Sequence, residues 1–310
     1  MLKSAHFPRW LPFVVLGIGL SAISFGAILA RLAQGGGVPS LSIAAWRLGF
    51  AALAVTPFAL WVLLRGDPDG SADSAAGNTI SRRQIGLALA AGLALALHFG
   101  TWISSLEYTS VASSTALVTT NPLWIGLASF VLFGERPRRT MLAGIALSLG
   151  GSFLIFLSDS RQAAAGADAL LGNVLALVGS WCFSAYLMIG RRLRAGLTLS
   201  LYIWLAYGVA ALFLFAGAGA SGAPLAGFGA AAWLALLGMA VGPQLIGHTS
   251  YNWSLKHVSP TFVAVVTLGE PVGSAALAFL IFGESLAPLQ AVGFALLLCG
   301  IYLAAKGESR

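Results

Sequence analysis

Charged residues are scarce in this chain. Only 9% of its 310 residues are Asp, Glu, Lys or Arg, whereas 58% are hydrophobic. A soluble domain carries about a quarter charged residues, which cover its surface. The chain has 17 basic and 10 acidic residues, too few for that purpose. The composition therefore excludes an ordinary soluble protein and indicates a chain that folds in a lipid bilayer.

Cysteine is also rare. Cys182 and Cys299 are the only two, and both fall inside apolar runs. Two isolated thiols indicate neither a disulfide framework nor a paired-thiol metal site, and we expect no metal and no cofactor. The net charge of +7 does not indicate a nucleic-acid partner, because the basic residues stand in short stretches between apolar runs.

Long apolar segments follow one another along the chain. A helix needs ~20 apolar residues to cross ~30 Å of hydrocarbon. The first segment exceeds the apolar core of a signal peptide, about 7 to 15 residues, so we expect it to be a retained helix. The sequence predicts an all-α membrane protein with ten transmembrane helices. They fall at about 11–30, 40–64, 84–106, 111–133, 139–158, 169–190, 199–217, 229–251, 259–282 and 286–305.

The distribution of basic residues predicts the orientation. With the N-terminus inside, fourteen of the seventeen basic residues lie in inner loops and tails. Arg31 and Arg161 fall outside, and Arg47 falls within a span. The positive-inside rule selects this orientation. We expect both termini to be cytoplasmic, in the inner (plasma) membrane of a bacterium.

The sequence contains an internal repeat. Residues 98–158 align with 247–307 at a constant offset of 149 without a gap, and 14 of the 61 pairs are identical. Pro122 matches Pro271, and the Phe-Gly-Glu ending at Glu135 matches the one ending at Glu284. Five helices per repeat is an odd number, so the second copy enters the membrane from the opposite side. Such inverted-topology repeats are typical of secondary transporters.

The loops and the predicted domains agree with inversion. The first copy continues as Arg136-Pro137-Arg138-Arg139, whereas the second continues as Ser285-Leu286-Ala287-Pro288 without a basic residue. One loop is therefore expected to be cytoplasmic and the other not. The predicted division is a cytoplasmic N-terminus 1–10, a first five-helix repeat 11–158, an extracytoplasmic linker 159–168, a second five-helix repeat 169–305 and a cytoplasmic C-terminus 306–310.

Pro122 and Pro271 interrupt the fourth and ninth helices at matched positions. A proline removes one backbone hydrogen bond and breaks or kinks a helix, which frees the carbonyls of Val118 and Thr267. Paired interruptions in two halves indicate a binding site at their interface. We assign these prolines to a helix kink or gate beside the cavity, with a simple packing kink as the alternative.

Glu270 and Arg47 are the only formal charges inside predicted spans, and Asn121 is the repeat equivalent of Glu270. A charge at membrane depth costs at least ~2.5 kcal/mol. Glu270 is a candidate to bind a substrate ammonium or to carry a coupling proton, unless it is a structural ion pair or a neutral acid. Arg47 is a candidate to hold a substrate carboxylate or to partner Glu270, unless it snorkels to the interface.

Aromatic residues suggest a pocket for a planar solute. His98 and Trp102 share one face of the third helix at a spacing of four, and the offset places Tyr251 opposite Trp102. Trp181 stands on the sixth helix. Aromatic rings with a few polar groups are typical of a binding pocket. The alternatives are interfacial belts for the aromatic residues and, for His98, a proton relay or a satisfied interior histidine.

The segments from Asn121-Pro122 to Glu135 and from Glu270-Pro271 to Glu284 resemble the EamA branch of the drug/metabolite transporter superfamily. The resemblance covers about 11 to 305. It implies a basket-shaped bundle, alternating access, and export of amino acids or other small metabolites from bacteria. The chain is similar, more narrowly, to bacterial aromatic amino-acid exporters, which also pass some drug-like cations.

Other functions fit less well. A nucleotide-sugar transporter would need several basic residues in its cavity, and only Arg47 qualifies. A membrane enzyme would need a nucleophile and base at a recognisable spacing, and neither G-x-S-x-G nor H-E-x-x-H occurs, so we expect no enzymatic activity. A channel would need a continuous water path. The expected partners are the bilayer and a small-molecule substrate, with coupling to a proton gradient left open.

Overall fold

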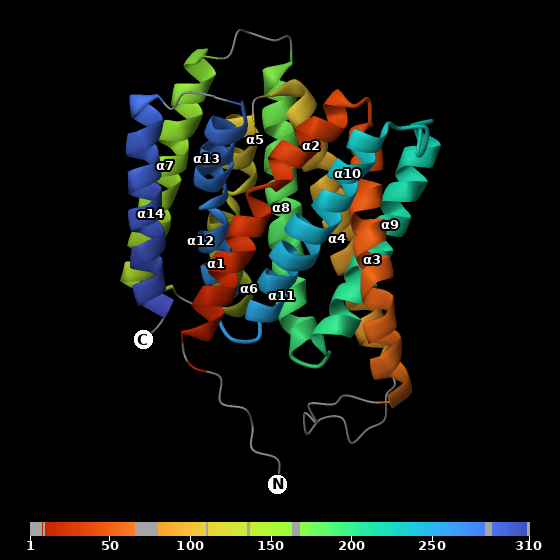
Figure 1. The fold of residues 1–310 in the computed structure, drawn as a ribbon. Coiled ribbons are helices and arrows are strands. Elements are labelled where there is room, and N and C mark those ends of the chain that lie inside the picture. The colour runs from red at the N-terminus through yellow and green to blue at the C-terminus, as the bar shows by residue number, and fades with distance from the viewer. Residues whose placement is uncertain are drawn as a thin grey trace.

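Helices make up nearly all of the computed structural model (Figure 1), which describes residues 8, 10–65, 80–109, 111–134, 137–162, 168–282 and 287–308. These ranges contain no β-strand. Glu135 and Glu284 of the repeated motif, the contrasting loop residues Arg136, Ser285 and Leu286, and positions 163–167 of the expected linker lie outside the described residues.

The helices follow the order predicted from the sequence. They are α1 (Leu11–Ile23), α2 (Gly26–Gly35), α3 (Ser40–Arg65), α4 (Arg82–Tyr108), α5 (Val111–Val118), α6 (Asn121–Phe133), α7 (Arg139–Gln162), α8 (Ala169–Arg194), α9 (Leu199–Ala220), α10 (Ala230–Met239), the π-helix η2 (Ala240–His248), α11 (Thr249–Ser254), α12 (Pro260–Thr267), α13 (Glu270–Phe282) and α14 (Pro288–Glu308).

Within the described ranges, eight helical stretches are long and apolar enough to cross a membrane. Helices also occupy the other two predicted segments. One of these is divided into α5 and α6, and α7 has a shorter apolar stretch, Arg139–Ile155. The prediction of an all-α, multi-pass membrane protein is confirmed, whereas the count of ten spans stays a prediction.

Large apolar side chains cover the outside of the bundle. Leu64 is 82% exposed and Leu280 is 75% exposed, and many other leucine, valine and phenylalanine side chains point outward. In water such a surface would drive aggregation, whereas lipid tails solvate it at no cost. The polar side chains, in contrast, gather inside the bundle.

Glycine permits a close helix crossing between α7 and α14, which lie side by side at one edge of the bundle (Figure 1). A Cβ atom on Gly144 would lie 2.6 Å from the carbonyl oxygen of Gly300, so no larger residue fits without moving a backbone. Gly151 meets Gly293 in the same way. Between these contacts the Ser148 hydroxyl donates to the Leu297 carbonyl at 3.2 Å.

The α7–α14 contacts repeat at the sequence offset. Gly144 corresponds to Gly293, and Gly151 to Gly300, both 149 positions apart. Exchanging each residue for its equivalent therefore converts one glycine contact into the other. Ser148 and Leu297, which bond to each other, are themselves equivalents. The contacts between α7 and α14 are thus symmetric, since each has a counterpart in which the two repeats exchange roles.

The helix interruptions also repeat. The bounds of α12 and α13 each lie 149 positions after those of α5 and α6. Pro122 and Pro271 are the second residues of α6 and α13, where the missing N–H would have no helical partner in any case. Just before the break, the Thr119 hydroxyl donates to the Thr115 carbonyl at 2.7 Å, beside the backbone bond from the Thr119 N–H at 3.1 Å. The prolines therefore begin second helices rather than bend continuous ones.

Two glycines permit close helix contacts at the centre of the bundle. Gly19 of α1 packs against Ser250 and Tyr251, while Gly179 of α8 packs against Thr101 and Trp102. Thr101 and Trp102 are the repeat equivalents of Ser250 and Tyr251. Gly19 and Gly179 are thus also equivalents, at an offset of 160. This pair of crossings surrounds the middle of the bundle, where α1, α5 and α12 end.

Candidate functional site

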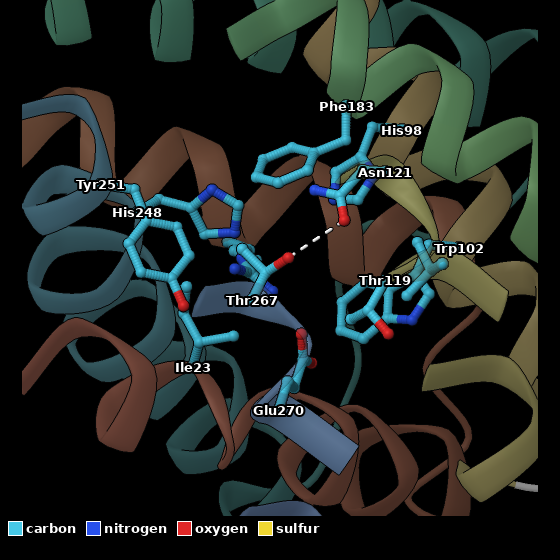
Figure 2. A pocket seen from close by; sticks show the side chains of 12 residues that line it. Ile23, His98, Trp102, Thr119, Asn121, Phe183, His248, Tyr251, Thr267 and Glu270 are labelled. Carbon is cyan, nitrogen blue, oxygen red and sulfur yellow. Dashed lines mark hydrogen bonds between the residues drawn. The ribbon is translucent and has the colours of Figure 1, made fainter. Parts of the chain in front are cut away.

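A cavity lies among these helix interruptions (Figure 2). Its volume is about 20 Å³, which is space for about one water molecule. The lining is mixed, with aromatic rings and both intramembrane charges. The lining residues are Ile23, Arg47, His98, Trp102, Val118, Thr119, Asn121, Phe183, His248, Tyr251, Thr267 and Glu270.

Six of the seven residues predicted to bind substrate line this cavity: Arg47, His98, Trp102, Asn121, Tyr251 and Glu270. Trp181 does not. Its side chain is half exposed on the outside of α8 and packs edge-on against Trp124, with ring centroids 5.5 Å apart. Pro122 and Pro271 are buried at the starts of the two helices that contribute Asn121 and Glu270. A gating role for the prolines stays a prediction.

Arg47 is held in the core rather than at the membrane surface. It is 1% exposed, and its Nε donates to the Gln244 side-chain oxygen at 2.8 Å. The guanidinium carbon lies 4.0 Å from the centre of the Phe99 ring, a cation–π geometry. The NH1 nitrogen has no hydrogen-bond partner among the described residues. The guanidinium is therefore fixed from one side and free to bind on the other.

Glu270 and Asn121 occupy matched positions at the starts of α13 and α6. Glu270 is 6% exposed, and its Oε1 has no hydrogen-bond partner in the described part of the chain. The Asn121 side-chain oxygen accepts from the Thr267 hydroxyl at 3.0 Å (Figure 2). Because Thr267 ends α12, this bond ties one helix break to the other. The Asn121 amide nitrogen is left unpaired in the described structure.

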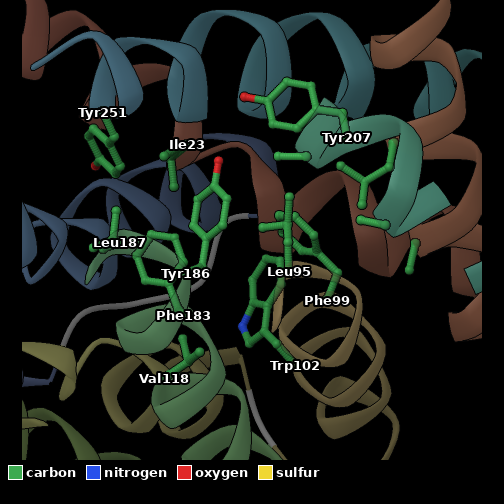
Figure 3. Close-up of a cluster of buried hydrophobic side chains, with 14 of the residues drawn as sticks. Ile23, Leu95, Phe99, Trp102, Val118, Phe183, Tyr186, Leu187, Tyr207 and Tyr251 are labelled. Carbon is green, nitrogen blue, oxygen red and sulfur yellow. The ribbon is translucent and has the colours of Figure 1, made fainter. Parts of the chain in front are cut away.

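The tautomer of His98 follows from its contact. Its Nδ1 lies 2.9 Å from the Gly179 carbonyl, which can only accept a hydrogen bond. Nδ1 therefore carries the proton in the neutral ring, and Nε2 keeps a lone pair. The ring stacks on Phe183 at 4.8 Å and lies parallel to Trp102 at 6.1 Å. Figure 3 shows Trp102 and Phe183 among the aromatic residues that surround the centre of the bundle.

Six polar atoms on the cavity wall have no hydrogen-bond partner among the described residues. They are Arg47 NH1, Trp102 Nε1, Asn121 Nδ2, His248 Nδ1, Tyr251 OH and Glu270 Oε1. Each buried polar atom without a partner costs about 1 to 3 kcal/mol, and native proteins contain only a few. Three of these atoms only donate, the Tyr251 hydroxyl and the His248 ring nitrogen can donate or accept, and the Glu270 carboxylate accepts, which is the arrangement expected of a polar ligand site.

Several lining residues were not predicted from the sequence. Ile23 and Phe183 are equivalents at the offset of 160, as Gly19 and Gly179 are. Val118 and Thr267 are equivalents at 149, and their carbonyls had already been marked as those freed by the prolines. The prolines thus pointed to Val118 and Thr267, whereas Ile23 and Phe183 are not equivalents of any candidate residue and carried no such signal. His248 and Thr119 have no such signal.

Comparison with known proteins agrees with the fold. The family model described as EamA-like transporter family matches residues 10–157 and again 170–306. An "Uncharacterized transporter" of Archaeoglobus fulgidus is 26% identical over 93% of this chain and 94% of its own length. The "Uncharacterized transporter YyaM" of Bacillus subtilis is 22% identical over 91% of this chain and 89% of its own length.

A solved crystal structure has the same fold. It superposes with a TM-score of 0.72 over 95% of this chain and 97% of its own, at 19% sequence identity. At that identity the likeness concerns the fold alone. The family model, in contrast, matches nearly the whole length in two copies, and the full-length relatives carry the name of transporter. This multi-pass membrane protein belongs to the EamA-like transporter family.

Proposed function

We propose that this protein is a secondary transporter that exports amino acids with aromatic side chains. One observation carries the proposal. The two intramembrane charges, Arg47 and Glu270, line one cavity and each has an unpaired polar atom among the described residues. A zwitterion is the small solute whose charges complement both. Buried charges at this depth are functional by default.

The unpaired atoms fit the two ends of an amino acid. A substrate carboxylate would accept from Arg47 NH1 and Trp102 Nε1, both of which only donate. A substrate ammonium would donate to Glu270 Oε1 and to the lone pair on His98 Nε2. The aromatic rings of Trp102, Phe183 and Tyr251 would then enclose the side chain. An aromatic side chain fits these rings better than a polar one.

The repeated contacts support an inverted arrangement of two five-helix halves. Exchanging equivalents converts the Gly144–Gly300 contact into Gly151–Gly293, as a two-fold axis in the membrane plane would. Such an axis would relate two sets of five spans, and it would bring the interruptions of both halves to the midplane. Exchange of the two conformations would expose the cavity to each side in turn, so transport would proceed by alternating access.

The loop charges support a bacterial inner-membrane location with both termini cytoplasmic. In Figure 1 α1 begins and α14 ends at the same end of the bundle. In the same figure α8, whose last turn is basic, ends at that end, and α4, which begins with Arg82, begins there. Solute would move outward, away from it. Glu270 is the candidate to carry a coupling proton, because it is the one acid among the described residues of the cavity wall.

A transport assay tests this proposal. Purified protein in proteoliposomes would be given a panel of radiolabelled amino acids and cationic dyes, with and without a pH gradient. We expect saturable transport of aromatic amino acids. Glu270→Gln should lower the initial rate at least about ten-fold, because a neutral amide replaces a charge-assisted bond to the ammonium.

The matched control is Asp168→Asn. Asp168 is an exposed carboxylate immediately before α8 and away from the cavity. The Asp168→Asn variant should transport at the wild-type rate. Wild-type rates in Glu270→Gln would remove this residue from the site, and a wild-type protein inactive towards every amino acid would overturn the proposed substrate.

Export of an organic cation is the second candidate. It is favoured by the same carboxylate beside stacked aromatic rings, which is how cations are often recognised. A cation would leave Arg47 without a role and opposed by like charge. Transport of dyes but not of zwitterions in the same panel would select this candidate. Nucleotide sugars are disfavoured, since Arg47 is the one Arg or Lys on the described cavity wall.

A further inference from the structure

A polar side chain at the end of α2 holds a carbonyl beside the cavity. The Gln34 amide donates to the Ile103 carbonyl at 3.0 Å and to the Ser40 hydroxyl at 2.9 Å. Ile103 directly follows Trp102 of the cavity wall on α4. We call the Gln34–Ile103 contact the outer latch. It ties the end of α2 to α4, which carries His98 and Trp102.

A second contact of the same kind lies at the end of α8. The Arg194 Nε donates to the Asn252 carbonyl at 3.2 Å, and its NH1 donates to the Leu197 carbonyl at 2.6 Å. Asn252 directly follows Tyr251 of the cavity wall on α11. Arg194 is 5% exposed. We call the Arg194–Asn252 contact the inner latch.

The two latches are equivalents in the repeat. Ile103 and Asn252 are 149 positions apart, and Gln34 and Arg194 are 160 apart, the offset that also relates Gly19 to Gly179. Their helices end at opposite ends of the bundle, α2 towards the top of Figure 1 and α8 towards the bottom. The two halves thus bind the same equivalent carbonyl, one with a glutamine side chain and the other with an arginine side chain.

We propose that Gln34 and Arg194 are the outer and inner gate residues of the transport cycle. This rests on the proposed alternating access. Each latch fixes a helix end against the helix that carries a large aromatic of the cavity wall, so solute passes that end only when the latch is open. Both latches are made in this structure, in keeping with a cavity of about 20 Å³.

The two gates differ in strength. Around the inner latch, the Asn252 amide also donates to the hydroxyls of Tyr186 at 2.7 Å and Tyr207 at 3.2 Å, and both tyrosines are fully buried. The outer latch is only partly buried and is supported by a Ser40–Glu107 hydrogen bond. A charged donor makes a stronger bond than a neutral one. The inner gate is the more firmly closed of the two.

Cysteine accessibility tests the gates without a known substrate. The background would lack both native cysteines (Cys182→Ala and Cys299→Ala), and Thr119→Cys would report on the cavity. A membrane-impermeant maleimide would be added to intact cells and to inside-out vesicles. Separate exposed reporters, Ser221→Cys and Lys256→Cys, would identify the outer and inner sides.

We expect opposite shifts from the two gate variants. Gln34→Leu should raise labelling of Thr119→Cys about five-fold from the side of Ser221, the factor of one net hydrogen bond. Arg194→Leu should raise it by at least as much from the side of Lys256. The double variant Gln34→Leu/Arg194→Leu should return the ratio of outer to inner labelling towards that of the parent. Loss of folding would not restore this ratio. Arg194→Lys, which keeps a donor, should restore part of the parent ratio.

Shifts to the same side in both variants, or no shift in either, would overturn the gates. If neither Arg194→Leu nor the milder Arg194→Gln accumulates as folded protein, Gln34→Leu alone is the test, and the absence of its outward shift in labelling would overturn the gates. The labelling result is separate from the substrate. Opposite shifts in a protein that transports no amino acid would support the gates and reject the proposed solute. Amino-acid transport without any shift in labelling would support the solute and reject the gates.

Discussion

Arg47 shows how one side chain can be both fixed and available. Its Nε donates a hydrogen bond to Gln244 and its planar face lies over the Phe99 ring, so the guanidinium keeps one orientation before any ligand binds. A site held in this way loses little entropy on binding. Lysine could neither stack in the same way nor bind Gln244 while presenting a second nitrogen in a fixed direction.

We therefore predict that Arg47→Lys weakens substrate binding although the charge is kept. The KM for an aromatic amino acid should rise about ten-fold, as expected for a loss of about 1.4 kcal/mol, with a smaller change in kcat. Initial rates over a concentration series in proteoliposomes would measure both. Arg82→Lys is the control, since Arg82 is exposed at the first turn of α4. An unchanged KM in Arg47→Lys would contradict the orienting role.

Sequence reasoning found most polar residues of the cavity but not their partners. Glu270, Asn121 and Trp102 stood out because charge, proline or the repeat marked them. The bond between Arg47 and Gln244 joins residues 197 positions apart, and no local pattern reveals it. Trp181 failed to reach the cavity because its face of α8 points outward, while Phe183, two residues later, points inward.

Among the elements, α7 and α14 depend most on residue size. Their backbones meet at four glycines, where an added Cβ would lie 2.5 to 2.8 Å from a carbonyl oxygen of the other helix. In a membrane, close packing of this kind must replace the hydrophobic effect as the force that joins helices. Positions elsewhere on α7 are open, and Gly150, beside Gly151, has nothing within 4 Å of an added Cβ.

This contrast gives a matched pair of substitutions. Gly144→Ala should destabilise the protein by about 1 to 3 kcal/mol, because its methyl group forces two backbones apart. Gly150→Ala should be neutral or slightly stabilising, since alanine favours the helix. Thermal denaturation in detergent, followed by loss of the monodisperse chromatographic peak, would compare them. Equal midpoints for the two variants would contradict the tight crossing.

The sequence located the helices better than their interruptions. The two prolines correctly marked where α6 and α13 begin, since proline is stable in the first turn of a helix. The break between α1 and α2 and the π-helix η2 were not predicted. Ser24 at the first break looks like an ordinary small residue, and Pro243 within η2 has no equivalent proline in the other half to mark it.

For the whole molecule, the repeat was predicted over only part of its length. A constant offset of 149 relates residues from 98 onward, whereas 160 relates the first helices. The difference of 11 positions, 160 minus 149, means that the first half is longer between these regions. An ungapped search therefore stops at His98. Contacts such as Gly19 with Tyr251 and Gly179 with Trp102 recover the earlier part.

The small volume of the central cavity has a consequence for the direction of net flow. The lining side chains nearly fill the cavity themselves, since it has space for about one water, and we expect both ends of the protein to close without cargo. A carrier that closes without cargo can also return without cargo. We therefore expect vesicles loaded with labelled substrate to release it into substrate-free buffer as fast as into buffer that contains unlabelled substrate. Release that required external substrate would contradict this expectation. We therefore expect net transport rather than obligatory one-for-one exchange.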